Sequence, residues 1–146
     1  MKIYLDTCCL NRPFDDQSYD RIKIESEAIM IILFNLAYGK WIWIGSEALE
    51  LEVNKTPDRD RLKRLKLLMK YTQESVKIDR KEIDRAKQLE NFGFHAMDAL
   101  HISCAESLEA DIFLTTDKKL LNLSFRLSEK LKVRVENPLK WLSEVI

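Results

Sequence analysis

The chain has 146 residues, of which 46% are hydrophobic, and its 24 Lys and Arg residues are balanced by 24 Asp and Glu residues. This length fits one domain with a core of its own, and we expect a single domain over residues 1–146. The zero net charge argues against a protein that coats nucleic acid through an overall positive charge, although a local basic face stays open. No apolar run reaches the ~18 residues of a membrane span, and no signal peptide precedes Asp6, so we expect a cytoplasmic protein without a membrane partner.

Short apolar runs alternate with helical periodicities along the chain. In chain order the pattern predicts a strand at 3–5, a turn at 11–13, a helix at 18–38, a strand at 41–44, a helix from 46, a helix at 59–72, a strand at 76–78, helices at 80–91 and 95–109, a strand at 112–115, a short helix from 117, a strand at 133–135 and a helix from 138. The strands are near-continuous apolar runs, which is typical of a buried parallel sheet. Strands that alternate with helices predict an α/β fold, a three-layer α/β/α sandwich with a mainly parallel sheet.

The three glycines and the three cysteines argue against two common kinds of binding site, a nucleotide site and a zinc site. Three glycines leave no glycine-rich phosphate loop, which disfavours nucleotide binding of the two common kinds. Cys8, Cys9 and Cys104 are an odd set without the spacing of a zinc site, and His95 and His101 do not complete one. We therefore interpret the cysteines as small, buried, apolar-like residues.

Acidic residues follow two of the predicted strands. Asp6 comes directly after the first strand, and Asp117 follows the strand at 112–115. In open α/β sheets, ligands bind at the carboxyl ends of the strands, so both carboxylates are expected in one crevice. Asp98, at the start of a predicted helix, would add a third acid, and a glutamate from the helix that starts at 46 would add a fourth.

Clustered carboxylates repel one another unless a cation completes the cluster, and oxygen ligands without His or Cys point to Mg²⁺ or Mn²⁺. A structural role remains open for most of these acids, because Asp98 and Asp117 could be helix N-caps and the glutamates could be solvated. Asp6 is harder to explain in this way, since no helix-capping pattern follows it.

Four segments of the sequence resemble the PIN-domain family, in the right order and over nearly the whole chain. They read IYLDTCCLNRPFDD, GSEALELEV, MDALHISCAESLEADIFLTTD and VRVENPLKWL. The chain is most similar to stand-alone prokaryotic PIN proteins of the kind that act as toxin ribonucleases in toxin–antitoxin pairs. The resemblance implies a five-stranded parallel sheet, Mg²⁺- or Mn²⁺-dependent cleavage of RNA, an antitoxin protein as a possible partner and a possible homodimer.

The resemblance also implies roles for individual residues. The four catalytic, metal-binding acids would be Asp6, Glu52, Asp98 and Asp117, with Glu47 as the rival of Glu52. Supporting hydroxyl groups would come from Thr7 and Thr116, and cations that bind the RNA backbone from Arg12, Lys118 and Lys119. Cys8 stands where the family often has Asn or Ser, which puts a polar supporting contact at that position in doubt.

We therefore expect a metal-dependent endoribonuclease in which a metal-bound water attacks the phosphorus in line. The main alternative is a catalytically silent PIN-like module that binds RNA or protein. A phosphatase with an aspartyl intermediate would need a second aspartate where Cys8 stands, and a receiver domain would need paired acids nearer to Asp6.

Overall fold

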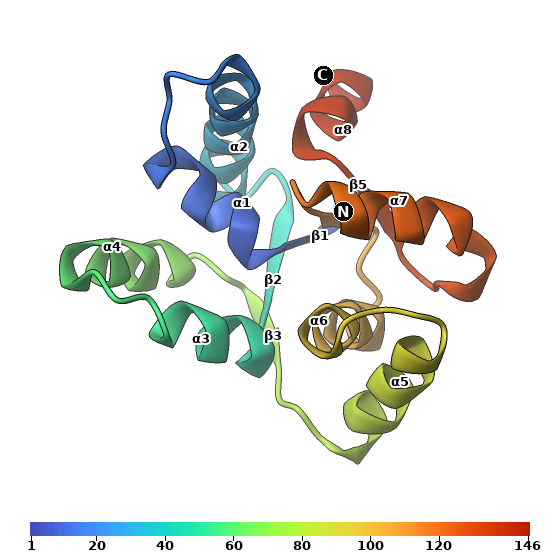
Figure 1. Ribbon diagram of the computed structural model, residues 1–146. Coiled ribbons are helices and arrows are strands. Elements are labelled where there is room, and N and C mark those ends of the chain that lie inside the picture. The colour runs from blue at the N-terminus through green and yellow to red at the C-terminus, as the bar shows by residue number, and fades with distance from the viewer.

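The computed structural model describes all residues, 1–146, and shows a three-layer α/β/α sandwich (Figure 1). Its central sheet has five parallel strands in the order β3-β2-β1-β4-β5. The strands are β1 (Lys2–Leu5), β2 (Ile42–Ser46), β3 (Glu74–Val76), β4 (Ile112–Leu114) and β5 (Arg134–Glu136). The predicted fold class is confirmed, and the sheet is wholly parallel.

Eight α-helices and two short 3₁₀ helices connect the strands and cover the sheet. They are α1 (Thr7–Asn11), η1 (Arg12–Phe14), α2 (Asp20–Ala37), α3 (Glu47–Asn54), α4 (Arg59–Met69), α5 (Arg80–Asn91), α6 (Ala96–Ser107), α7 (Lys118–Arg126), η2 (Ser128–Lys130) and α8 (Pro138–Val145). No helix among them is both long enough and apolar enough to cross a membrane.

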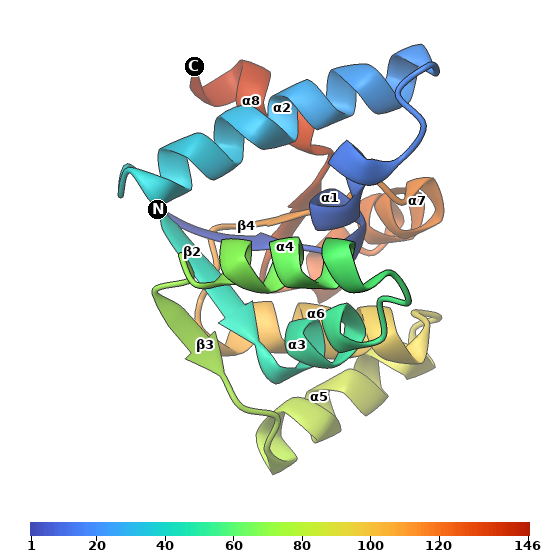
Figure 2. The same ribbon diagram turned by 90° about the vertical axis from the view of Figure 1, so that its left-hand side faces the viewer.

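The two faces of the sheet bury separate apolar clusters, and different helices cover each face (Figures 1 and 2). Along β1 the side chains alternate, so Ile3 and Leu5 pack on one face and Tyr4 on the other. Helices α1, α2, α4 and α8 cover the first face, whereas α5, α6 and α7 cover the second. Helix α3 contributes to both clusters, through Leu49 to the first and Ala48 to the second.

Two parts of the predicted secondary structure differ from the observed elements. The stretch after β1 forms the short helix α1 before the predicted turn, because Asp6 caps it by accepting a hydrogen bond from the Thr7 backbone N–H. The third strand pairs with β2 at Glu74–Val76 instead of 76–78. It is an edge strand with only partly buried or exposed side chains, so its apolar pattern is weak.

The order of the strands brings the ends of β1 and β4 together. Leu5 lies opposite Leu114 in the sheet, and the Asp6 backbone N–H donates to the Leu114 carbonyl at 3.0 Å. The residues that follow these two strands, Asp6 and Thr115, therefore begin side by side at the carboxyl edge of the sheet. This edge is where a parallel α/β sheet places its ligands.

Candidate metal centre

Asp6 is a buried carboxylate, only 6% exposed, whose two oxygens have separate partners. Its Oδ1 accepts a hydrogen bond from the Thr7 backbone N–H at 2.8 Å and so caps α1. Its Oδ2 accepts from the Thr115 hydroxyl at 2.8 Å and from the Cys8 thiol at 3.4 Å. Burial raises the pKa of Asp6 above the usual range for an aspartate. The expectation that Asp6 has no capping role was therefore wrong, because its Oδ1 caps α1.

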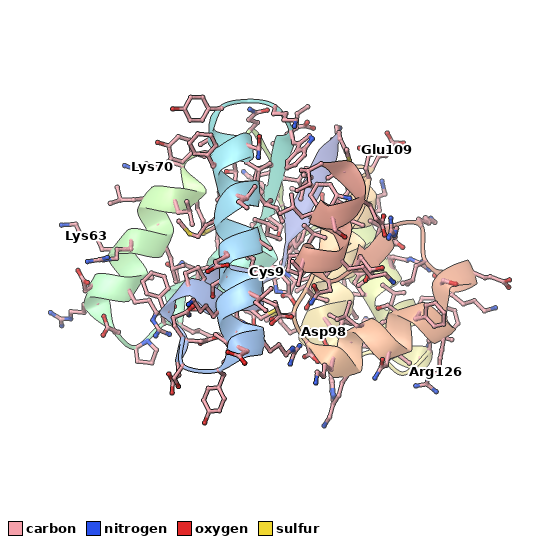
Figure 3. The ribbon with its side chains drawn as sticks, turned by 90° about the horizontal axis from the view of Figure 1, so that it is seen from above. Cys9, Lys63, Lys70, Asp98, Glu109 and Arg126 are labelled. Atoms are coloured by element: carbon pink, nitrogen blue, oxygen red, sulfur yellow. The ribbon has the colours of Figure 1, made fainter.

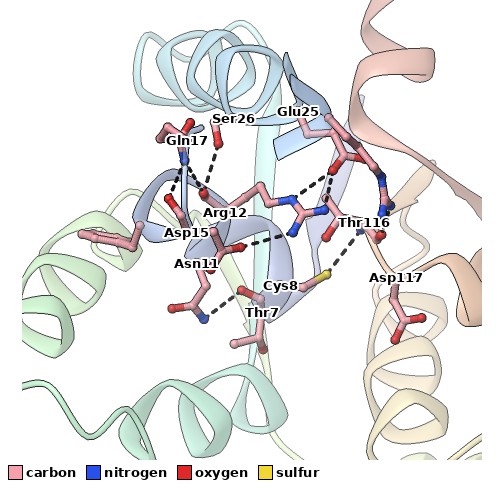
Figure 4. Close-up of polar contacts among 12 residues, drawn as sticks. Thr7, Cys8, Asn11, Arg12, Asp15, Gln17, Glu25, Ser26, Thr116 and Asp117 are labelled. Atoms are coloured by element: carbon pink, nitrogen blue, oxygen red, sulfur yellow. Dashed lines mark hydrogen bonds and ion pairs between the residues drawn. The ribbon is translucent and has the colours of Figure 1, made fainter. Parts of the chain in front are cut away.

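Cys8 takes part in this polar network, although its position in the sequence had put such a contact in doubt. Its sulfur lies 3.2 Å from the Thr115 hydroxyl and accepts a hydrogen bond from the Thr116 backbone N–H at 3.3 Å (Figure 4). The hydroxyl that contacts Asp6 belongs to Thr115 and not to Thr116. Cys9 and Cys104 are fully buried, as expected, and all three cysteines are free.

Glu52, from α3, reaches the same edge and is held by two side chains. The Thr7 hydroxyl donates to its Oε1 at 2.6 Å, and His101 Nε2 contacts the same oxygen. The hydrogen bond with His101 is the largest influence on Glu52 and holds the pKa of this carboxyl below its usual value, against the opposing effect of burial. One potential ligand atom from each of Asp6, Glu52 and His101 lies within 4.8 Å of the others.

Glu47, the rival glutamate, has a different role in the structure. Its Oε1 accepts a hydrogen bond from the Ile78 backbone N–H at 2.9 Å, which ties the start of α3 to the segment that follows β3. The geometry therefore favours Glu52 as the glutamate of the site.

His101 is the residue of the site that the sequence patterns missed. It is fully buried on α6, and its Nδ1 lies 2.6 Å from the Tyr4 hydroxyl, which lies 2.6 Å from the Ser46 hydroxyl. With Glu52 ionised and the imidazole neutral, Nε2–H donates to Glu52 and the Tyr4 hydroxyl donates to Nδ1. The available signal was its spacing, because a residue three positions after Asp98 lies on the same face of a helix.

Asp98 lies in the first turn of α6, where His95 and not Asp98 occupies the N-cap position. Burial raises the pKa of Asp98 to about 6, and the charges of Asp6 and Asp117 add to the effect. Asp117 is the N-cap of α7, and its Oδ1 accepts from the backbone N–H groups of Lys119 at 2.9 Å and Leu120 at 3.2 Å. The three aspartates thus influence one another, although Asp98 and Asp117 lie outside the tight group around Glu52.

The donor set fits a divalent cation. None of the four acids forms a salt bridge with a lysine or an arginine. The one basic side chain that pairs with any of them is His101, which contacts Glu52. Carboxylate oxygens are the ligands that Mg²⁺ and Mn²⁺ prefer. Both ring nitrogens of His101 are engaged in hydrogen bonds, so His101 is placed to orient Glu52 and not to bind the metal itself. A cation here would relieve the repulsion from Asp6 and Asp117, which adds to the effect of burial on the pKa of Asp98.

The cations expected to bind RNA differ in their surroundings. The Arg12 guanidinium is mostly buried and forms ion pairs with Glu25 at 2.6 Å and Asp15 at 3.2 Å (Figure 4). Arg12 therefore links η1 to α2, and its charge is already paired within the protein. Lys118 and Lys119 are exposed at the start of α7, directly after Asp117, and neither forms an ion pair.

Comparison with known proteins found no matching family model and no matching curated protein. Solved structures are similar over nearly their whole length. VapBC2 from Rickettsia felis, bound to a DNA fragment from its promoter, gives a TM-score of 0.60 with 17% identity over 94% of this chain and 98% of that one. FitAcB from Neisseria gonorrhoeae gives a TM-score of 0.60 with 16% identity, over 93% of this chain and 97% of that one. VapBC-1 from nontypeable Haemophilus influenzae gives a TM-score of 0.58 with 14% identity, over 94% of this chain and 98% of that one. At these identities the likeness concerns the fold, and the chain thus has the PIN fold that its sequence resembles.

Proposed function

We propose that this protein is a metal-dependent endoribonuclease that hydrolyses RNA phosphodiester bonds with Mg²⁺ or Mn²⁺. The observation that carries the proposal is the grouping of Asp6, Glu52 and His101 within 4.8 Å, with Asp98 and Asp117 near enough to act on one another's charge. A group of acids with no lysine or arginine to neutralise it is expensive to keep in a fold, so a role that needs the negative charge accounts for it best.

The four acids Asp6, Glu52, Asp98 and Asp117 would hold the cation. When bound, Mg²⁺ or Mn²⁺ would supply a Lewis acid for the phosphoryl oxygens and would lower the pKa of a water molecule. The chain itself fixes the ligands in place before the metal arrives. Thr7 and His101 both hold Oε1 of Glu52. Because these two bonds fix the carboxylate group, they also fix the direction of its other oxygen, Oε2.

RNA would enter past the exposed end of α7. Lys118 and Lys119 carry free ammonium groups next to Asp117 and would bind phosphates beside the cleaved bond. Thr116 is buried, and its backbone carbonyl accepts a hydrogen bond from the Arg21 guanidinium at 2.6 Å, which holds the segment before Asp117 in place. A loss of RNA affinity on neutralising Lys118 or Lys119 would accord with this assignment.

We further propose that the protein is the toxin of a toxin–antitoxin pair in the cytoplasm, with an antitoxin protein as partner and a homodimer as its assembly. The sequence resemblance to toxin ribonucleases supports this, as does the fold shared with chains from the VapBC2, VapBC-1 and FitAcB structures. Co-expression with the product of an adjacent gene, followed by purification of a stable complex, would identify that partner.

The test of the nuclease is cleavage of a labelled RNA by purified protein, with Mn²⁺ or with EDTA. We expect cleavage with Mn²⁺ and none with EDTA. Asp98→Asn should slow cleavage by about 100-fold or more, because a metal contributes several kcal/mol and each 1.4 kcal/mol is about tenfold in rate. Asp84→Asn is the matched control, because it makes the same chemical change on an exposed part of α5 and should cleave like the wild type.

Two results would contradict the metal mechanism: cleavage that persists in EDTA, or equal rates for Asp98→Asn and Asp84→Asn. A protein that binds RNA without ever cleaving it would instead be the silent PIN-like module.

A further inference from the structure

Positive charge is concentrated in one segment of a chain whose total charge is zero. Residues 55–70 contain seven lysines and arginines but only two aspartates. Because the whole chain has 24 residues of each sign, the remaining residues carry the compensating excess of acids. The neutral total therefore conceals a basic region built on α4.

Four of these cations form a line along one face of α4. Arg59, Lys63, Lys66 and Lys70 follow the spacing i, i+4, i+7 and i+11, which places them on one side of a helix over about 16 Å. We call these four residues the basic stripe. All four are exposed, and Figure 3 shows Lys63 and Lys70 directed away from the body of the protein.

The basic stripe has no acidic partner within the chain. None of its members forms a salt bridge, and the one ion pair within α4, Arg64 with Asp60 at 3.1 Å, involves neither a stripe residue nor a buried group. With Leu62 and Leu67 the stripe lines a shallow hollow of about 400 Å³ that contains no acid. The four charges are thus available to an anion from outside.

The basic stripe begins at the end of α4 that lies on the side of the sheet where β1 ends. Lys55 follows α3, the helix that carries Glu52, and its positive charge acts on that carboxylate. The first turns of α4 are fixed against the segment that follows α1: the Arg61 guanidinium donates to the Phe14 carbonyl at 3.2 Å and lies 5.1 Å from the centre of the Phe14 ring. Figure 2 accordingly shows the start of α4 beside α1, on the side of the sheet where β1 ends.

We propose that the basic stripe binds the phosphate backbone of an RNA strand and leads that strand to the metal centre. This inference rests on the proposed nuclease function and names the surface that its substrate uses. Lysines bind phosphate as point charges without reading bases, so the contact is independent of sequence. An acidic protein is the less favoured occupant, because protein interfaces depend on buried aromatic and arginine anchors, whereas the stripe is composed mainly of exposed lysines.

The experiment measures binding, and not cleavage, of a fluorescently labelled single-stranded RNA in EDTA at several salt concentrations. The stripe variant is Lys63→Gln, Lys66→Gln and Lys70→Gln combined. The control variant, Lys81→Gln, Lys87→Gln and Lys132→Gln combined, removes the same charge from exposed lysines without ion pairs elsewhere on the protein. A melting curve of each variant verifies that it is folded.

We expect the stripe variant to lose most of its RNA affinity. Each phosphate contact to a single strand contributes about 0.7 to the slope of log K against log salt, so three lost contacts should lower that slope by about 2. This corresponds to about a 100-fold loss of affinity at 0.1 M salt. The control variant should differ from the wild type by only a few-fold.

Equal affinities of the stripe and control variants would overturn the proposal and direct the search to an acidic protein partner. The two proposals can also fail separately. If the wild type never cleaves RNA but the stripe variant alone loses affinity, the stripe stands and the nuclease does not. If the stripe variant binds RNA like the wild type while Asp98→Asn abolishes cleavage, the nuclease stands and the stripe does not.

Discussion

At the scale of single residues, Asp6 caps a helix and also lies in the candidate metal centre. Its Oδ1 caps α1 and its Oδ2 is held by Thr115 and Cys8. One carboxylate oxygen of Asp6 also lies within 4.8 Å of potential ligand atoms of Glu52 and His101. Asp117 divides its carboxylate in a similar way, since only Oδ1 accepts the capping hydrogen bonds of α7. A capping role and a metal-binding role therefore do not exclude each other at either position.

Glu52→Gln and Glu47→Gln should have very different effects on the site. Glu52→Gln removes a negative charge beside Asp6, so it should greatly reduce both RNA cleavage and the stabilisation by Mn²⁺. Glu47→Gln should change both by less than about threefold, because the amide oxygen can still accept the hydrogen bond from Ile78. Cleavage rates and Mn²⁺ titrations of the two variants test this, and the opposite ranking would assign the site to Glu47.

The sequence predicted which edge of the sheet gathers acids, but not the side chains that hold them. Asp6 and Asp117 could be placed because each follows a strand, and the ends of parallel strands meet at one edge. His101 could not be placed by spacing alone, because its contact with Glu52 depends on how closely α6 approaches α3. The hydroxyl that contacts Asp6 belongs to Thr115, one residue before the predicted Thr116. Side chains alternate in direction along an extended segment, so only one of these two neighbours can face Asp6.

At the scale of elements, one chain of hydrogen bonds, buried except at its Glu52 end, connects four elements of the fold. It runs from Ser46 at the end of β2, through Tyr4 of β1 and His101 of α6, to Glu52 of α3. Helix and strand periodicity predicted these elements individually, whereas their mutual position comes from packing and from such contacts. The unpredicted α1 and the shifted edge strand β3 likewise depend on contacts that periodicity does not show. The Asp6 side chain fixes the start of α1, and pairing with β2 fixes the ends of β3.

His101→Phe should weaken metal binding without abolishing the fold. Phenylalanine fills a similar volume but can neither donate to Glu52 nor accept from Tyr4, so Glu52 loses one of the two bonds that orient it. Loss of such a supporting contact typically costs about 10–100-fold in metal affinity. The measurement is the Mn²⁺ concentration that produces half of the maximal rise in melting temperature, compared between variants.

His95→Phe is the control for that measurement, because His95 is exposed at the start of α6 and its side chain caps nothing. It should show the metal affinity of the wild type. An unchanged Mn²⁺ affinity in His101→Phe would mean that His101 does not position Glu52.

At the scale of the whole molecule, a chain of zero net charge separates its charges in space. The carboxyl edge of the sheet gathers acids without lysine or arginine partners, while the basic stripe on α4 gathers cations without acidic ones. This separation is invisible in the composition and only partly visible along the sequence, because it depends on which elements the fold brings together. It also means that the metal-free protein should contain electrostatic repulsion at a defined place, the edge where Asp6, Asp98 and Asp117 act on one another.

Asp98→Asn should therefore stabilise the metal-free protein. The folded pKa of Asp98 is raised to about 6 from an ordinary value of 3.8, so its charge opposes folding at pH above about 6. That penalty fades as the pH falls through 6. After allowance for screening by solvent we expect about 1 kcal/mol, or a rise of about 2–4 °C in melting temperature at pH 7.5 in EDTA.

The difference between Asp98→Asn and the wild type should shrink as the pH is lowered from 7.5 to 5, because the wild-type carboxyl then takes up its proton. Added Mn²⁺ should reverse the ranking at pH 7.5, since a ligand stabilises by RT ln(1 + [L]/Kd) and the variant binds it more weakly. Melting curves of the wild type, Asp98→Asn and the exposed control Asp84→Asn, each in EDTA and in Mn²⁺ at both pH values, decide the matter. If Asp98→Asn behaves like Asp84→Asn in all four conditions, Asp98 is neither crowded by its neighbours nor a ligand of the metal.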